Sequence, residues 1–296
     1  MKDELGALNH VTASRQVAAA RLVTKGRLFT LGLPIFGPEG EPLAPDRPKA
    51  RRISYRDWSD YSQGKVRPSA SGLAYVDDGI SIHSHGTTHV DALGHIIIDG
   101  KMFDGRSASE TSPVPDRASI GTLGERGIFT RAVIADVPRH LGVERLDRRH
   151  HVTLRQLQDT LSAQSVTVGP GDILILRTGS LADFYEIGAE AFFEEYSEPG
   201  LSYEAELVEW FRRNELSGLG SDTLSNELPT CPGDSSQYPL HKHLLHGIGI
   251  IFHEALWLED LAADCAADGR WDGLYMSAPL KAWGLSGSPV NPMVAK

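Results

Sequence analysis

The run Ile173-Leu174-Ile175-Leu176 is the feature that most constrains the fold of this chain. It follows a Gly-Pro-Gly-Asp turn at 169–172 and contains only branched apolar side chains. An unbroken apolar strand is typical of a sheet that is covered on both faces. Similar strand-like runs occur at 130–137, 218–222 and 248–252. The sequence therefore predicts an α/β fold with a central sheet.

Helical patterns lie beside these runs. The segment 153–156 has the spacing of a capping box, and Ser202 precedes a second amphipathic segment. Near the N-terminus, Ser14 can cap a helix, which we expect to pack on its own domain rather than on a neighbouring subunit. The expected organisation is an N-terminal helical arm over 1–26 and one domain over 27–296.

Composition narrows the class of protein. The 296 residues carry a formal net charge of −10 and no block of lysine and arginine, which argues against a nucleic-acid partner. Two cysteines, Cys231 and Cys265, cannot form a disulfide framework. No signal peptide and no run of about eighteen apolar residues is visible, so no membrane span is expected. These features favour a cytoplasmic enzyme.

Four of the chain's twelve histidines and a carboxylate lie within fourteen residues. They are His83, His85, His89, Asp91 and His95. Neutral imidazole and carboxylate are ligands of zinc and manganese. A straight strand would hold His85 and His89 about 13 Å apart at ~3.3 Å per residue, too far to share an ion. We therefore expect a turn at Gly86, followed by a helix from about residue 88 that places Asp91 and His95 on one face.

This stretch resembles the signature of the "putative cyclase" family of metal-dependent hydrolases, which includes bacterial kynurenine formamidase and isatin hydrolase. The family signature is His-x-Gly-Thr-His-x-Asp-x-Pro-x-His. Here the segment is His85-Gly86-Thr87-Thr88-His89-Val90-Asp91-Ala92-Leu93-Gly94-His95, with Thr87 and Leu93 in place of glycine and proline. The resemblance implies that His85, His89 and Asp91 bind a divalent metal and that His95 is the catalytic acid/base. It also implies a single domain of the swivelling β/β/α type, with a central mixed sheet flanked by helices, assembled as a homodimer or homotetramer.

A second cluster lies near the C-terminal end. His241 and Glu254 resemble the distal histidine and glutamate that complete a second metal site in some family members, with Asp91 as the bridge. His243 and His246 compete with His241 for that role. A glutamate at the end of a buried run needs a cation, a metal or a histidine partner. A structural pair between Glu254 and a histidine is therefore the alternative to a ligand.

Candidate substrate contacts lie outside both clusters. Residues 34–50 are rich in proline and charge, which predicts a long loop, and such loops are often functional lids. Tyr55, Trp58 and Tyr61 recur at the spacing of a helix face, which favours packing, with Trp58 as the candidate for a substrate wall. Asp222 at the end of a predicted strand is a candidate substrate-binding carboxylate or a turn cap.

These features and the resemblance together predict a metal-dependent hydrolase acting on a small molecule, and hydrolysis is favoured because the characterised members of the family that the chain resembles hydrolyse. It would use water activated by Zn²⁺ or Mn²⁺ to open an amide, cyclic amide or lactone carbonyl, with one ion or two. The absence of a Gly-x-Ser-x-Gly elbow argues against an α/β-hydrolase. Two alternatives stay open: a metal-dependent cyclase or dehydratase that stabilises an enolate, and a non-catalytic metal- or ligand-binding protein. His95 favours catalysis, because binding alone needs no additional base.

Overall fold

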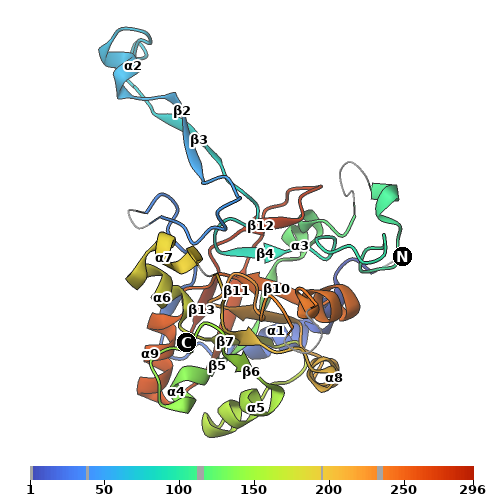
Figure 1. The fold of residues 1–296 in the computed structure, drawn as a ribbon. Coiled ribbons are helices and arrows are strands. Elements are labelled where there is room, and N and C mark those ends of the chain that lie inside the picture. Colours follow the sequence, from blue (N-terminus) through green and yellow to red (C-terminus); the bar gives the residue numbers. More distant parts are fainter. Residues whose placement is uncertain (1–2, 38–39, 112–116, 195, 232–235) are drawn as a thin grey trace.

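The apolar runs of the sequence form the parallel centre of a large curled sheet (Figure 1). The computed structural model describes residues 3–37, 40–111, 117–194, 196–231 and 236–296. The strands of the sheet are β1 (Leu28–Thr30), β4 (His89–Asp91), β5 (Ile128–Asp136), β7 (Ile173–Arg177), β9 (Gly218–Ser221), β10 (Ile251–Glu254), β11 (Asp272–Ser277), β12 (Gly287–Pro289) and β13 (Met293–Ala295). Within the described residues their spatial order is β1-β13-β11-β5-β7-β9-β10-β4-β12.

Parallel pairing is confined to the middle of this sheet. Strands β5, β7, β9 and β10 pair in parallel, whereas the strands on either side of them are antiparallel. Parallel strands need cover on both faces, and every residue of β7, β9 and β10 is accordingly buried. A separate small parallel pair joins β6 (His151–Val152) to β8 (Gly200–Leu201).

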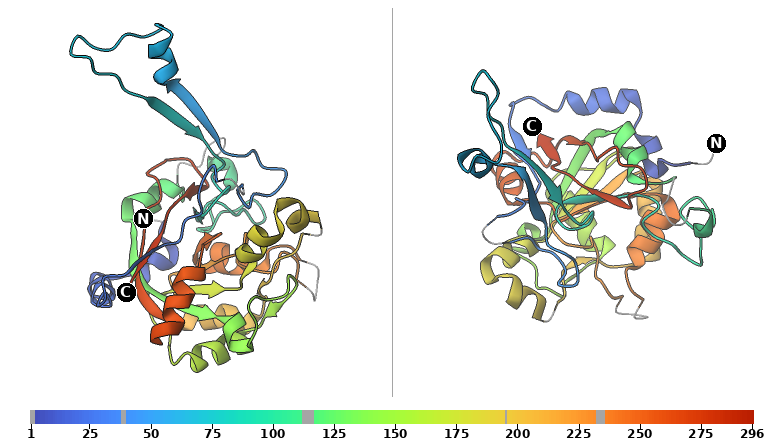
Figure 2. Two further views of the ribbon diagram at one scale, coloured as in Figure 1. Left: turned by 90° about the vertical axis from the view of Figure 1, so that its left-hand side faces the viewer. Right: turned by 90° about the horizontal axis from the view of Figure 1, so that it is seen from above.

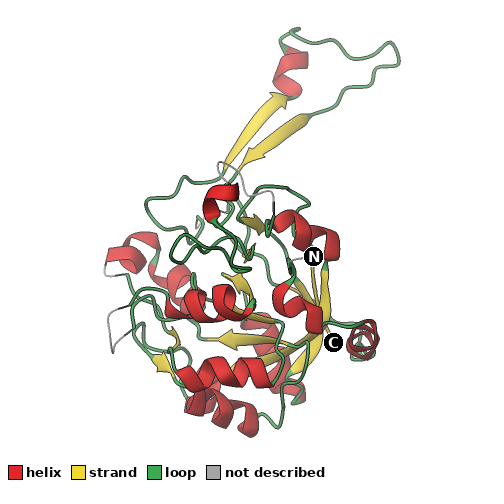
Figure 3. Ribbon diagram, turned by 90° about the vertical axis from the view of Figure 1, so that its right-hand side faces the viewer, coloured by secondary structure: helices red, strands yellow, loops and turns green. Residues whose placement is uncertain are grey.

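Helices cover both faces of the sheet (Figure 3). They are η1 (Gly6–His10), α1 (Ala13–Ala20), η2 (Ala108–Thr111), α3 (Ile120–Arg126), α4 (Val137–Leu141), α5 (Leu154–Ala163), α6 (Ser180–Ile187), α7 (Ala189–Glu194), α8 (Ala205–Arg213), the π-helical segment η3 (His241–His246) and α9 (Glu259–Asp268). Ile175 of β7 packs in one core with Leu261 of α9, while its neighbour Leu174 packs in the other with Leu157 of α5 and Phe211 of α8. The predicted central mixed sheet flanked by helices is confirmed.

The N-terminal segment packs on the chain's own sheet. Helix α1 begins at Ala13, and Thr12 rather than Ser14 caps it by accepting a hydrogen bond from the Arg15 amide. Buried Ala19 of this helix contacts Leu274 of β11 and Ala295 of β13. The helix therefore stabilises its own domain, as expected.

A long hairpin leaves the body of the molecule. It comprises residues 51–81, is separate from the N-terminal segment 1–26, and is called the arm from here on. Its strands β2 (Arg51–Arg56) and β3 (Asp77–Ser81) pair antiparallel, and α2 (Trp58–Ser62) lies near its tip. Figures 1 and 2 show the arm projecting away from the sheet and its helices. The prediction of one packed helix face that includes Tyr55 and Trp58 is therefore wrong, because Tyr55 lies on β2 and Trp58 is 68% exposed. The sequence spacing was helical, but the antiparallel pairing of β2 with β3 determines the local structure.

No helix in the described part of the chain is long and apolar enough to cross a membrane.

Candidate metal centre

The histidine-rich stretch enters the sheet as a short strand. A turn closed by the hydrogen bond from the Gly86 amide to the His83 carbonyl precedes β4, as the spacing argument requires. The prediction of a helix from residue 88 is wrong, because residues 89–91 form β4, which pairs with β10 on one side and with β12 on the other. His89 and Asp91 are two residues apart on this strand, so their side chains point to the same face. The turn brings the ring of His85 to within 4.9 Å of the ring of His89, measured between centroids.

The three predicted ligands of the first ion converge and are buried. His85 Nδ1 lies 2.8 Å from Asp91 Oδ1, and His89 Nε2 lies 3.4 Å from the same oxygen. His89 Nδ1 is 2.7 Å from the Thr87 carbonyl and donates to it, which leaves Nε2 as the ring nitrogen that faces the cluster. His85, His89 and Asp91 offer ligand atoms that all lie within 4.8 Å of one another.

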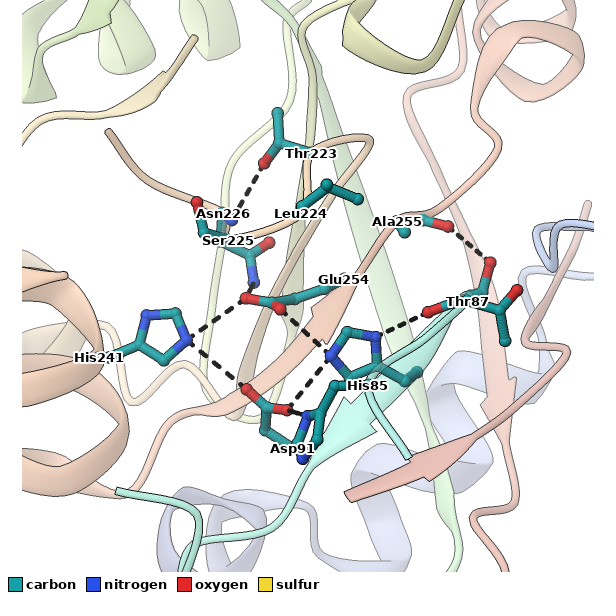
Figure 4. A network of polar contacts seen from close by, with 12 residues as sticks. His85, Thr87, Asp91, Thr223, Leu224, Ser225, Asn226, His241, Glu254 and Ala255 are labelled. Carbon is teal, nitrogen blue, oxygen red and sulfur yellow. Dashed lines mark hydrogen bonds and ion pairs between the residues drawn. The ribbon is translucent and has the colours of Figure 1, made fainter. Parts of the chain in front are cut away.

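The predicted distal pair joins this cluster from the other side. His241 Nε2 lies 3.6 Å from Asp91 Oδ2 and 3.5 Å from Glu254 Oε1, and Glu254 Oε2 lies 3.2 Å from His89 Nε2. Figure 4 shows the side chains of Asp91, His241 and Glu254 pointing toward one another. His241 Nδ1 is 2.7 Å from Glu227 Oε1, an outer carboxylate that orients the ring.

The neighbouring histidines do not reach the cluster. His243 stacks on Tyr203, with ring centroids 4.6 Å apart. His246 Nε2 lies 3.0 Å from the Lys101 carbonyl. Of the three candidates on η3, the structure brings His241 alone to Asp91, and the π-helical turn sets the direction of its side chain.

The buried polar atoms of this cluster fit a cation. His89 Nε2 and both carboxylate oxygens of Asp91 make no hydrogen bond of acceptable geometry within the described residues. Burial lowers the pKa of His89, but the carboxylates of Asp91 and Glu254 outweigh it and raise that pKa to about 10. The two carboxylates therefore favour a positive charge at the position of His89 Nε2. A divalent metal with nitrogen and oxygen ligands suits this arrangement.

His95 lies beside the first three ligands. Its ring stacks on the ring of His85 with centroids 4.2 Å apart, and a ring nitrogen lies within 4.8 Å of ligand atoms of Asp91 and His241. Burial lowers the pKa of His95 to about 4, although Asp91 acts in the opposite direction. The imidazole is thus neutral near pH 7. It can accept a proton or, through the same nitrogen, serve as a further ligand.

A cavity of about 170 Å³ opens onto the cluster. Sequence analysis missed several residues that shape it or its ligands, namely Arg47, Asn226, Glu227, Tyr238 and Gly287. Asn226 donates a hydrogen bond to Glu254 from a loop with no recognisable motif. Only the pairing of distant strands and loops places these residues here, so the sequence carried no usable signal for them.

The two predicted substrate contacts lie elsewhere. Trp58 is on the arm, and the structure does not bring it to the cluster of its own chain. Both oxygens of the Asp222 carboxylate accept hydrogen bonds from the protein itself. Its Oδ1 accepts from the amide and hydroxyl of Thr178, and its Oδ2 accepts from the Gly179 amide. Asp222 therefore joins the ends of β9 and β7, which corresponds to the turn-cap alternative.

Gly287 leaves room for His85. It lies opposite Asp91 in the pairing of β12 with β4. A Cβ atom at this position would lie 2.5 Å from His85 Cε1 and 2.9 Å from His85 Nε2. Any larger residue must displace the imidazole ring, since real Cβ atoms do not approach so closely.

Gly287→Ala should weaken metal binding by about 10- to 100-fold, the range for a disturbed outer contact of a ligand. Isothermal titration of metal-free protein with Zn²⁺ or Mn²⁺ would measure it. Gly169→Ala is the matched control, because its nearest atom would be 3.9 Å away. Unchanged affinity in Gly287→Ala would show that His85 is not a ligand.

Asp222→Asn should destabilise the fold by about 1–3 kcal/mol, because the new amide group would face a backbone donor. Urea unfolding would measure the loss, with exposed Asp159→Asn as the control. Normal stability combined with a raised KM would instead assign Asp222 to substrate binding.

Comparison with known proteins places the chain in a family. The family model described as "Putative cyclase" matches residues 9–227. A solved structure described as a novel cyclase has a TM-score of 0.88 at 29% identity, covering 99% of this chain and 96% of that chain. Isatin hydrolase A from Ralstonia solanacearum has a TM-score of 0.65 at 21% identity, covering 96% and 98%.

A predicted metal-dependent hydrolase from Bacillus stearothermophilus has a TM-score of 0.51 at 18% identity, covering 92% of this chain and 98% of that chain. No curated protein sequence matches the chain. Because the family model spans well over half of the residues and the signature side chains converge in the fold, this chain belongs to the "putative cyclase" family.

Proposed function

We propose that this protein is a metal-dependent hydrolase that opens an amide, cyclic amide or lactone carbonyl of a small molecule. The observation that carries the proposal is the convergence of five buried side chains beside a cavity. They are His85, His89, Asp91, His241 and Glu254. The fold shared with an isatin hydrolase and a metal-dependent hydrolase supports hydrolysis as the reaction class.

The residues divide into two overlapping ligand groups. His85, His89 and Asp91 would hold one ion, and His241 and Glu254 with Asp91 would complete a second position. Their nitrogen and oxygen atoms suit Zn²⁺ or Mn²⁺. A divalent ion bound there would lower the pKa of water from ~15.7 toward ~7 and polarise a substrate carbonyl.

His95 supplies the proton transfers. Its neutral ring, stacked on His85 at the edge of the cavity, can take a proton from the attacking water. The resulting imidazolium can then protonate the leaving nitrogen or oxygen. The nearby carboxylate of Asp91 stabilises that charged form, and His85 holds the ring in place by stacking.

Replacing a ligand and replacing the base should have different effects. His89→Ala should lose metal and activity together, because it removes the nitrogen that faces both Asp91 and Glu254. His95→Ala should keep its metal while kcat falls by about 10²–10⁴-fold, the usual contribution of general acid–base catalysis. Elemental analysis and turnover of N-formyl aromatic amines, isatin-like cyclic amides and lactones would measure both.

Two results would contradict these assignments. A wild-type metal content in His89→Ala would remove that residue from the ligand set. Loss of one metal equivalent in His95→Ala would make His95 a ligand, as its distance to Asp91 and His241 also permits. Full activity after exhaustive chelation would overturn the proposed chemistry itself.

We also propose that the protein works as a homodimer or homotetramer in which the arm packs on a neighbouring copy. Its exposed large apolar side chains are Ile53, Tyr55, Trp58, Leu73, Tyr75, Val76 and Ile80. A two-stranded hairpin is marginally stable alone, and an exposed apolar patch of this kind is typical of an interface. A second copy offers the same arm, so a closed symmetric pair can cover both arms at once.

The triple variant Tyr55→Ser, Trp58→Ser, Leu73→Ser should associate at least about tenfold more weakly than the native chain, because aromatic anchors dominate most interfaces. Sedimentation velocity over a concentration series would measure the association. The double variant Leu141→Ser, Val143→Ser removes exposed apolar groups from the body and should behave like the native chain. A monomeric native protein would refute the assembly.

A further inference from the structure

A permanent positive charge lies in the wall of the metal-site cavity. Arg47 belongs to the irregular segment 40–50 and lines the cavity of about 170 Å³ together with His85, His89 and Tyr238. Its Nη1 donates a hydrogen bond of 2.6 Å to the His85 carbonyl. That bond fixes the guanidinium beside the turn that carries the first predicted ligand.

The guanidinium has no carboxylate partner in the part of the chain that the structure describes. Its one polar contact there is the His85 carbonyl, although an arginine has five N–H donors. The side chain is half-buried and lines the cavity, so its remaining donors are available to a ligand there. A cation held in this way is suited to a planar anion, because its donors match a carboxylate in pairs.

A second cavity shares part of its lining, including Arg47, with the first. This space of about 70 Å³ is also lined by His85, His89 and Tyr238, and additionally by Tyr196. The Tyr196 hydroxyl donates to Glu198, whereas the Tyr238 hydroxyl makes no hydrogen bond within the described residues. Tyr238 can therefore donate to a ligand that also contacts Arg47.

We infer that Arg47 and Tyr238 form a subsite for a carboxylate that the substrate carries apart from its reacting carbonyl. This inference rests on the proposed hydrolase function and names its substrate class: an aromatic or cyclic amide or lactone bearing an acid group. The reacting carbonyl would lie toward His85, His89 and Asp91, and the acid group would lie in the second cavity. Hydrolysis itself also forms a carboxylate, which is an alternative ligand for Arg47 and Tyr238. The experiment must distinguish it from the carboxylate that the substrate already carries.

Matched substrates test the charge requirement on the metal-loaded protein. We would compare an N-formyl aniline bearing a ring carboxylate with its ring carboxamide analogue. For Arg47→Gln, kcat/KM should fall about 10- to 100-fold for the carboxylate through KM, the range for a lost hydrogen bond to a charged group. It should change less than about threefold for the carboxamide. Arg47→Lys keeps the charge without the paired donors and should lie between the two.

Controls and contrary outcomes follow from the same measurements. Exposed Arg155→Gln on α5 should match the native enzyme with both substrates. Equal losses for carboxylate and carboxamide in Arg47→Gln would overturn the inference, because they would indicate a role in holding His85 or the product. A preference of the native enzyme for the carboxamide would overturn it as well.

A binding measurement separates this inference from the hydrolase proposal. Calorimetry should show that native protein binds benzoate at least about tenfold more tightly than benzamide, and that Arg47→Gln loses this difference. That result would support the subsite even if neither N-formyl aniline were hydrolysed. Benzoate affinity unchanged in Arg47→Gln would show that the anion binds at the metal centre instead, and the subsite would be refuted.

Discussion

Buried carboxylates at the edge of the parallel strands are the constraint on which the rest of the structure depends. Asp91, Glu227 and Glu254 are all buried, and each faces an imidazole. Burying ionised carboxylates costs free energy unless groups of opposite charge compensate for them. Without metal, the raised pKa values of His89 and His241 let these rings carry protons and supply that compensation. A divalent metal bound at this cluster would replace those protons, which would couple metal affinity to pH and to folding.

Strand register determines how these groups meet. His89 on β4 is the direct cross-strand partner of Glu254 on β10, and Asp91 is the partner of Gly287 on β12. Directly opposed residues on one face of an antiparallel pair have Cβ atoms about 5 Å apart, close enough to share an ion. A slip of one residue would turn the ligands to the other face. The change from parallel to antiparallel pairing at β10 thus creates the site, and the two neighbouring cores that hold the sheet rigid also hold the ligands.

Sequence reasoning succeeded where a local pattern and its physical cause coincide. Apolar runs such as 173–176 predicted buried central strands, and the density of histidines around Asp91 predicted a cluster. It failed where distant pairing decides the outcome. Residues 88–95 could form a helix by spacing, but β10 and β12 take His89 to Asp91 into the sheet. Asp222 is a carboxylate at the end of a strand, where site residues often lie. However, the backbone amides that donate hydrogen bonds to it come from the end of another strand. No one-dimensional pattern contains those contacts.

The predicted ligands and Arg47 come from segments with different local structure. The predicted ligands come from paired strands, the turn before β4 and η3, all anchored in the cores. Segment 40–50 contributes Arg47 to the lining of both cavities, and it forms neither helix nor strand in its described residues. In the part of the chain that the structure describes, Arg47 is hydrogen-bonded to the predicted ligands only through the His85 carbonyl, a backbone atom that every residue type offers. The segment can therefore change its side chains without altering the ligand set. For this reason the signature identifies the family, whereas the proposed substrate class rests on the charge that this segment presents.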